Sequence, residues 1–497
     1  MNELTEVSGL ENTNDIKTSE KLLSIIFALC IGIVFDKFIK EKALGVSYYI
    51  FIFLSVSFFL WSLRKTIKPE VNFGWLLLIP INLLAFNFAF YTNSIFQVLN
   101  FLLIPLLMVT SSILISNRTI VWDKITFIQE LVIKALIDPL KNIGSPFKIL
   151  IEASVKKNKK GMSPIQKQIL LGLLISLPLL FIIMLLLISA DMVFSYYVGN
   201  ISKIFDSPNL DQIISDTLVI ATIAIYLFCY VWAFRKSEKK EQRQVVESGS
   251  WQSVTIITIL TMLNILYTLF TIIQFSYLYN GVDGGLPAGF TFAEYARRGF
   301  FELVAVTFVN FMILVGCFTF MKKENRKLGA IANVMLTLLI LFTINMLWSA
   351  HSRLSLYELT YGLTYLRVFV HIFMALLSVL CLIALVNIWY RRIPFIKVVI
   401  AVSIICYTLV NYINIDRFII KENIANKKLD ISYLIRLSDE VVPYLIDLQK
   451  NTEISDTDKI LIKENLLQRK TKINRQDKWY EFNFSRNNAR KLLKGVQ

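Results

Sequence analysis

Long apolar runs recur along the chain and constrain its fold more than any other feature. We count eleven candidate spans, at residues 22–35, 43–63, 73–91, 95–115, 165–188, 217–234, 252–279, 299–321, 329–349, 366–389 and 395–413. An α-helix needs about 20 apolar residues to cross the roughly 30 Å hydrocarbon core of a bilayer. The first run is shorter, so it is either a full span or a re-entrant or interfacial piece. We therefore predict an all-α integral membrane protein with about eleven transmembrane helices.

Composition and charge agree with this class. Hydrophobic residues make up 55% of the 497 positions and charged residues only 18%, against about 25% charged in soluble domains. The net charge of +16 does not indicate nucleic acid, because Lys and Arg lie between the apolar runs. They concentrate in 64–68, 118–167, 235–243 and 322–327. By the positive-inside rule these loops are cytoplasmic, which predicts a cytoplasmic N-terminus and an extracytoplasmic C-terminus.

The runs and the polar segments between them predict five regions. Residues 1–21 are polar and acidic and are expected to form a disordered cytoplasmic tail. The regions that follow are the first four spans (22–116), a cytoplasmic interfacial basic segment (117–164), a seven-span core (165–413) and a small helical extracytoplasmic domain (414–497). The last region has helical periodicity, with Ser438 and Ser455 as candidate cap residues, and it is a candidate surface for a protein partner.

The segment 117–164 combines an amphipathic stretch with a compact basic cluster. "WDKITFIQELVIKALIDPL" is expected to lie as a helix in the membrane interface. The candidates for binding anionic lipid head groups are Lys156, Lys157, Lys159 and Lys160. The same lysines would serve equally well as a plain anchor for the following span.

Ionisable side chains gather at one set of span ends. The candidates for ligand binding are Asp191, Glu294, Arg298, Glu302, His351, Arg353, Glu358, Arg367 and His371, and Asp416 and Arg417 follow the last span. On the predicted topology all of them lie on the outer side, whereas the inner ends carry simple Lys and Arg runs. Because charge inside a bilayer is costly, such residues usually face protein or water.

The spacing in "TFAEYARRGFFELV" places Glu294, Arg298 and Glu302 on one helix face as an acid–base–acid ladder. Glu302 or Asp191 is a candidate partner for Arg367. Three interpretations stay open: a salt-bridge network that fastens helix ends together, a site for binding or proton handling, or an active site.

Motifs that would name an activity are missing from the sequence. The five cysteines fall inside apolar runs without a CxxC pair, and two histidines are too few for a metal site, so we expect neither metal nor cofactor. HExxH, GxSxG and Walker A patterns do not occur.

Several blocks in sequence order carry a resemblance. "ISADMVF" at 188–194, "YARRGFFELV" at 295–304, "RLSLYELTYGLTYLR" at 353–367 and "LDISYLIRLSDEVVPYL" at 429–445 resemble a bacterial membrane family catalogued as domain of unknown function 4173, related to 4153. The resemblance implies a multi-pass protein of the bacterial cytoplasmic membrane and implies no reaction.

Three functions follow as hypotheses. The first is binding, sensing or transport of a small polar or lipid-linked ligand in an outward-facing polar pocket. The second is a membrane-embedded enzyme on lipid-linked envelope precursors, with Glu302 or Asp191 as general base and Arg367 on a phosphate. The third is a scaffold or regulatory subunit that docks through 414–497.

Overall fold

Helices make up nearly all of the regular structure that the described residues form. The computed structural model describes residues 18–65, 67, 70–116, 121–124, 126–157, 172, 183–184, 187, 190–194, 196, 210–235, 251–278, 299–321, 326–390, 393–475 and 478–495. Within these ranges the exception is one isolated bridge between Trp251 and Met321. The predicted all-α class is confirmed for the described part of the chain.

Eight helices are long and apolar enough to cross a membrane. They are Val46–Leu63, Phe73–Phe90, Ser94–Ser116, Gln212–Arg235, Ser253–Gln274, Phe300–Phe320, Arg326–Tyr361 and Tyr365–Trp389. A ninth is reached if the pair Phe395–Asn411 and Ile415–Ala425, bent by 62°, is one span. The run at 22–35 forms a helix that is not among the eight, and the predicted span 165–188 lies almost wholly outside the described residues. The chain is a multi-pass membrane protein, and the total of eleven spans stays a prediction.

The chain divides into two compact units, which are described separately. Unit 1 holds residues 1–90, 97–241 and 476–483, and unit 2 holds residues 91–96, 242–475 and 484–497. The helices of unit 1 are α1 (Thr18–Phe38), α2 (Val46–Leu63), α3 (Phe73–Leu76), α4 (Leu78–Phe90), most of α5 (Ser94–Ser116), α6 (Thr126–Val132), the π-helical η2 (Ile133–Ile137), α7 (Asp138–Lys141), α8 (Ser145–Lys157), α11 (Leu210–Arg235) and the 3₁₀ turn η4 (Trp479–Glu481). The predicted boundaries at residues 116, 164 and 414 stay predictions.

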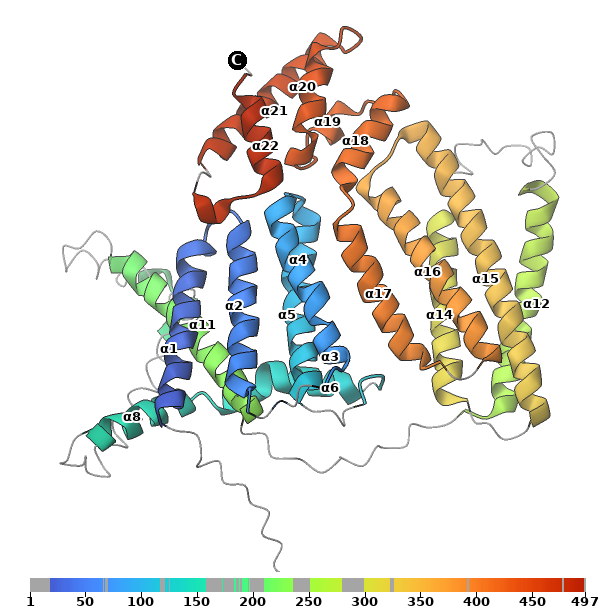
Figure 1. Cartoon of the computed structure of the whole chain (residues 1–497). Coiled ribbons are helices and arrows are strands. Elements are labelled where there is room, and N and C mark those ends of the chain that lie inside the picture. The colour runs from blue at the N-terminus through green and yellow to red at the C-terminus, as the bar shows by residue number, and fades with distance from the viewer. Residues whose placement is uncertain are drawn as a thin grey trace, which may run out of the picture. The chain divides into compact units, whose positions relative to one another are not determined.

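Helix α1 packs along α11 and is held by charges near both ends (Figure 1). A Cβ on Gly32 would stand 2.7 Å from the carbonyl oxygen of Ile220, so only glycine permits this close approach. Near one end, Glu20 pairs with Lys65 at 2.8 Å; near the other, Asp216 pairs with Lys37 and Lys40 at 3.0 Å each. The helix begins at Thr18, whereas the disordered tail was predicted to extend to residue 21.

Side-chain hydrogen bonds satisfy backbone groups near the break between α3 and α4. Ser111 donates to the carbonyl oxygen of Gly74 at 2.8 Å, and the side chain of Asn72 caps α3 and donates to the carbonyl oxygen of Leu114 at 2.8 Å. Backbone groups inside a bilayer need such partners because water is absent there.

Short helices occupy the segment predicted to lie in the interface. In Figure 1, α6 and α8 run across the direction of α1 and α2 in unit 1. Ile128, Leu136 and Leu140 expose apolar side chains, and Lys134 pairs with Asp138 at 2.8 Å. Lys156 and Lys157 end α8, whereas Lys159 and Lys160 lie outside the described residues. Lipid binding by these four lysines stays a prediction.

Unit 2 contains a bundle of long helices and a set of shorter ones. The bundle consists of α12 (Ser253–Leu278), α14 (Phe300–Phe320), α15 (Arg326–Tyr361), α16 (Tyr365–Trp389) and α17 (Phe395–Asn411). Its apolar core also contains hydrogen bonds between helices. Tyr267 donates to Asn310 at 2.7 Å, Asn310 donates to Thr343 at 3.0 Å, and Gln274 donates to Ser349 at 2.7 Å. Hydrogen bonds between membrane helices are each worth about 0.6 kcal/mol.

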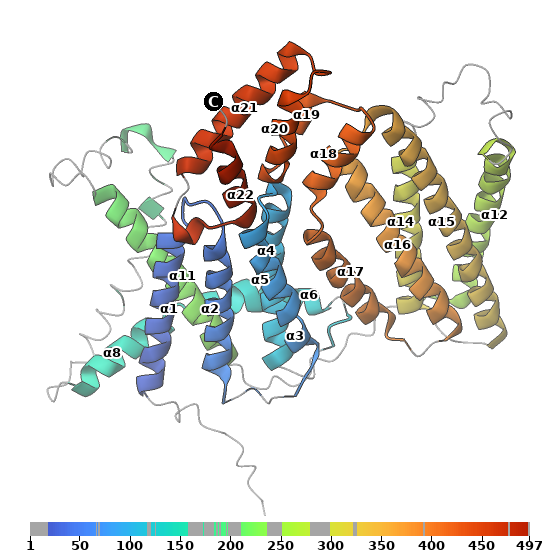
Figure 2. The ribbon, with the colours of Figure 1, turned by 45° about the horizontal axis from the view of Figure 1, so that its top comes forward.

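The shorter helices of unit 2 are α18 (Ile415–Ala425), α19 (Ile431–Leu434), the 3₁₀ turn η3 (Asp439–Val441), α20 (Val442–Lys450), α21 (Asp456–Arg475) and α22 (Phe484–Leu493). They share an apolar core with Phe96, Val368 and Val410. Both views place α18 and α19 near the end of α16 at which the chain arrives from α15 (Figures 1 and 2). As predicted, Ser455 caps a helix, accepting from the Asp458 amide at 3.2 Å.

Candidate functional site

The turn between α15 and α16 is the framework of the candidate site. Gly362 has φ of +75°, and a Cβ there would stand 2.7 Å from Asn423 Oδ1, so the turn requires glycine. Asn423, buried on α18, accepts from the Leu363 amide at 2.6 Å and donates to the Leu363 carbonyl oxygen at 2.9 Å. The Tyr365 amide donates to the hydroxyl of Tyr433 on α19 at 2.8 Å. Helices α18 and α19 therefore hold the turn directly.

Both histidines of the chain meet beside this turn. His351 Nδ1 and His371 Nδ1 stand 3.1 Å apart, and His371 Nε2 lies 2.9 Å from Glu358 Oε2. The side chains of His371 and Glu358 are 23% and 14% exposed, whereas His351 is open to solvent. The Oε1 atom of Glu358 is buried and accepts no hydrogen bond from a described residue. Three titratable groups from α15 and α16 thus form one contiguous chain of polar contacts.

Two arginines lie on the same helices, each with its own neighbours. A Cβ on Gly299, which has φ of +94°, would stand 2.6 Å from Nη1 of the buried Arg353, so glycine makes room for this guanidinium. Arg367 donates from Nη1 to the Gly362 carbonyl oxygen, and its guanidinium lies 4.3 Å from the ring centre of Tyr357. Cation–π contact of this kind stabilises a partly buried arginine.

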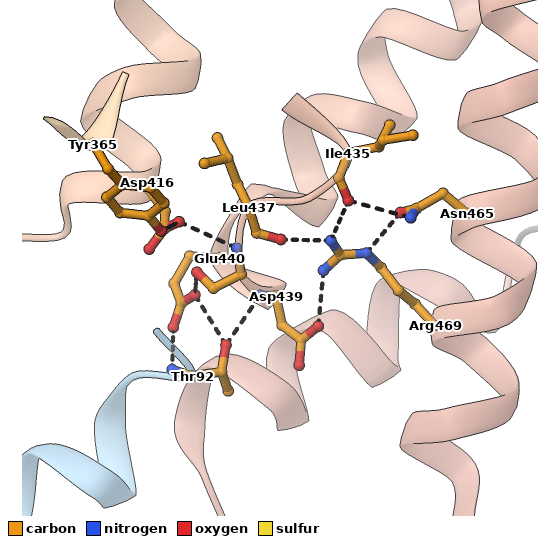
Figure 3. Close-up of polar contacts among 10 residues, drawn as sticks. Thr92, Tyr365, Asp416, Ile435, Leu437, Asp439, Glu440, Asn465 and Arg469 are labelled. Atoms are coloured by element: carbon orange, nitrogen blue, oxygen red, sulfur yellow. Dashed lines mark hydrogen bonds and ion pairs between the residues drawn. The ribbon is translucent and has the colours of Figure 1, made fainter. Parts of the chain in front are cut away.

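A second polar cluster joins Asp416, the second residue of α18, to the turn before η3 (Figure 3). Asp416, 2% exposed, accepts hydrogen bonds from the Asn93 side chain at 2.6 Å, from the Ser438 amide at 3.1 Å and from the Tyr365 hydroxyl. Because the cluster includes Tyr365, it contacts the start of α16 directly. Three separate stretches of unit 2 therefore converge on one carboxylate.

Glu440 is the second buried carboxylate of this cluster. It accepts from the Thr92 amide at 2.6 Å, from the Thr92 hydroxyl at 3.0 Å and from the Ser438 hydroxyl. Ser438 was predicted to cap a helix, but its hydroxyl binds Glu440 instead, because this carboxylate lies two residues away. Burial raises the pKa of Glu440 and the charge of Asp416 adds to this, while the bonds from Ser438 and Thr92 oppose it.

Arg469 of α21 completes the cluster. It pairs with Asp439 at 2.9 Å and donates to the carbonyl oxygens of Ile435 at 2.8 Å and Leu437 at 2.5 Å, as Figure 3 shows. Arg469 thereby fixes the bend before η3. Beside Asp416 and Glu440 lies a cavity of about 10 Å³, room for about one water molecule.

The structure brings together only some of the residues predicted to form a site. His351, Glu358 and His371 are in contact. Glu294 and Arg298 lie outside the described residues, so the ladder with Glu302 stays a prediction. Glu302 is exposed in the first turn of α14. Asp191 belongs to unit 1, where its carboxylate accepts from the Phe194 amide at 2.7 Å.

These placements bear on the hypotheses. Arg367 contacts Gly362 and Tyr357, and neither Glu302 nor Asp191 forms an ion pair with a described residue. The enzyme hypothesis therefore stays a prediction. Among the described residues, no three His, Cys, Asp or Glu side chains surround a common metal position.

Sequence reasoning missed the neutral partners of the site. Thr92, Asn93, Asn423 and Ser438 carry no charge, so a search for ionisable residues passes over them. Glu440 lies in the block "LSDEVVPYL", where it reads as an ordinary helix-start acid. Asp416 is the acidic residue of this cluster that the sequence indicated, because it closely follows the last apolar run.

Comparison with known families gives one match. A model for Domain of unknown function (DUF4153) matches residues 78–448, which contain the turn, the histidine pair and both buried carboxylates. This match shows the related family 4153, and the finer resemblance to domain 4173 stays a prediction. Neither curated proteins nor solved structures gave a match. Since the match covers more than half of the chain, the protein belongs to the DUF4153 family.

Proposed function

We propose that this membrane protein binds and senses a small polar ligand where α15 ends and α16 begins. This is the side that the Lys and Arg distribution predicts to be outside. The observation that carries the proposal is the contact of the chain's two histidines with each other and with Glu358. The half-buried Glu358 has one oxygen without a hydrogen-bond donor among the described residues, and a ligand, or water bound to that ligand, can supply the donor.

Sensing fits better than transport because the site is tied to the helices after α17. The Gly362 amide donates to the Glu358 carbonyl oxygen at 2.8 Å, one helical turn on. Asn423 and Tyr433 hold the next residues of the same turn. A ligand that moves Glu358 therefore acts on a segment that α18 and α19 contact, and these helices would report its presence to a partner.

The proposal is tested by thermal unfolding of the purified full-length chain in detergent. The panel comprises divalent chlorides, phosphate, amino acids, simple sugars and glycerophosphate head groups. A ligand at a concentration 100 times its Kd stabilises a protein by about 2.7 kcal/mol, which a melting curve resolves. We expect at least one class to raise the melting temperature of the wild type, His371→Gln to abolish that rise and Glu358→Gln to reduce it.

Glu464→Gln is the matched control, because Glu464 is an exposed glutamate of α21. It should keep the full ligand response. A panel without any stabilising compound refutes the proposal, as does a response that survives in both site variants. If Glu358→Gln lowers the melting temperature without ligand and no response exists to lose, the cluster only fastens α15 to α16.

A further inference from the structure

The histidine pair has a geometry that identifies a class of ligand. His371 Nε2 faces the Glu358 carboxylate at 2.9 Å. A carboxylate is an acceptor, so this nitrogen carries the hydrogen, and in the neutral form of the ring Nδ1 then has a bare lone pair. That lone pair faces His351 Nδ1 at 3.1 Å. A hydrogen bond joins the two nitrogen atoms when His351 carries a hydrogen at Nδ1, and the two lone pairs can instead hold one cation when it does not.

The separation suits two ligands of one transition-metal ion. Imidazole nitrogens bind such ions at about 2.0–2.1 Å, so two of them at this spacing subtend an angle of roughly 100° at the metal. This lies between the angles of octahedral and tetrahedral coordination. The ring planes of His351 and His371 are inclined by 71° with centres 4.9 Å apart, so the rings do not stack on each other.

Glu358 supplies the interaction that metal-binding histidines usually have. Such a histidine donates its other ring N–H to a carboxylate, which fixes the tautomer and raises the basicity of the ligand. His371 and Glu358 have this relationship. A ligand set of neutral imidazoles favours Zn²⁺, Cu²⁺ and Ni²⁺ over Mg²⁺ and Ca²⁺, which prefer oxygen.

We propose that His351 and His371 bind one divalent transition-metal cation of the Zn²⁺ class through their Nδ1 atoms, with Glu358 as the positioning residue on His371. The inference rests on the proposed function and names its ligand. Described protein groups provide two ligands, and water reaches the remaining positions through the exposed side of His351. Two protein ligands hold the ion exchangeably, as a sensor requires.

The test is metal titration of the full-length chain after removal of metal with a chelator. We expect one Zn²⁺ per chain by calorimetry, and Co²⁺ in its place should give a visible ligand-field spectrum. His351→Gln and His371→Gln should each abolish binding. Glu358→Gln should keep one ion per chain but weaken its affinity at least about tenfold, the effect typical of removing such a carboxylate.

Cys30→Ser is the control, because Cys30 is an exposed thiol that can hold metal on its own. Binding that this variant retains and both histidine variants lose supports the proposal. Lack of saturable binding, or binding that disappears only with Cys30, overturns it. If metal does not bind but another panel compound stabilises the chain through Glu358, the metal inference fails and the proposed function stands. If neither response exists, both fail.

Discussion

Asn423 is the residue whose loss should separate α18 from the α15–α16 turn. Its side chain makes two hydrogen bonds to the backbone of Leu363, at 2.6 and 2.9 Å, and is 4% exposed as a residue. Asn423→Ala removes both bonds and leaves the amide and the carbonyl of Leu363 without this partner. Leu363 is only half-buried, so water partly replaces the lost groups.

The cost follows from these two contacts. A typical intramolecular hydrogen bond contributes about 1 kcal/mol net, so the turn loses about 2 kcal/mol of local stability. Since 1.4 kcal/mol is a factor of ten in an equilibrium constant, the turn should open about 30-fold more often. Hydrogen exchange of peptides covering 363–368 measures this directly, because exchange follows the population of the open state.

Asn426→Ala is the matched control, three residues later at the C-cap of the same helix. Asn426 is exposed and donates only to the Glu422 carbonyl oxygen of its own helix. Exchange in 363–368 should therefore match the wild type in this variant. If exchange in Asn423→Ala stays within about threefold of the wild type, these two bonds do not hold the turn, and the reasoning that connects α18 to the site is refuted.

Three further predictions concern the same end of unit 2. Burial raises the pKa of Glu440 above its ordinary 4.5. The contribution of this carboxyl group to stability is therefore complete below about pH 4.5 and is lost as pH rises through the raised pKa. Melting curves from about pH 4 to about pH 8 should show this decline in stability, and Glu440→Gln should flatten it. Gly362→Ala should lower the free energy of unfolding by about 1–3 kcal/mol because φ is +75°. Gly329→Ala is the control, because a Cβ there meets nothing within 4 Å, and it should not lower the stability. Equal melting temperatures of the two variants would contradict the assigned strain. Arg469→Met should destabilise by about 1–3 kcal/mol by leaving Asp439 unpaired, and Arg469→Lys should recover part of this loss; a Lys variant as unstable as the Met variant would show that the charge is irrelevant.

The spans were predictable because hydrophobic length is a local property. Runs such as 95–115 and 366–389 coincide with α5 and α16 within a few residues. The run at 329–349 was predicted too short, because α15 continues to Tyr361 through His351 and Glu358. Helix hydrogen bonding does not stop where apolar residues stop, so a hydropathy window misses such an extension.

The partners within the site were not predictable from spacing. The i,i+4 rule relates residues on one helix, but His351 and His371 lie on different helices and meet across the turn at Gly362. Similarly, Glu440 accepts a hydrogen bond from Thr92, which is 348 positions away in the sequence. One sequence records which residues are charged, and only the packing of helices decides which of them meet.

Reciprocity gives the sharpest test of whether the site and the later helices form one device. If a ligand at Glu358 tightens the α15–α16 turn, loosening that turn must weaken the ligand by the same free energy. Asn423→Ala should therefore raise the Kd of the ligand by the factor by which it lowers the fraction of closed turn, a fraction that hydrogen exchange of 363–368 measures in both proteins. Asn423 belongs to α18 and contacts the turn at Gly362 and Leu363, so an altered Kd would come through the turn. Unchanged affinity in a variant whose fraction of closed turn is measurably lower would leave a binding site without an output, and sensing through α18 and α19 would be excluded.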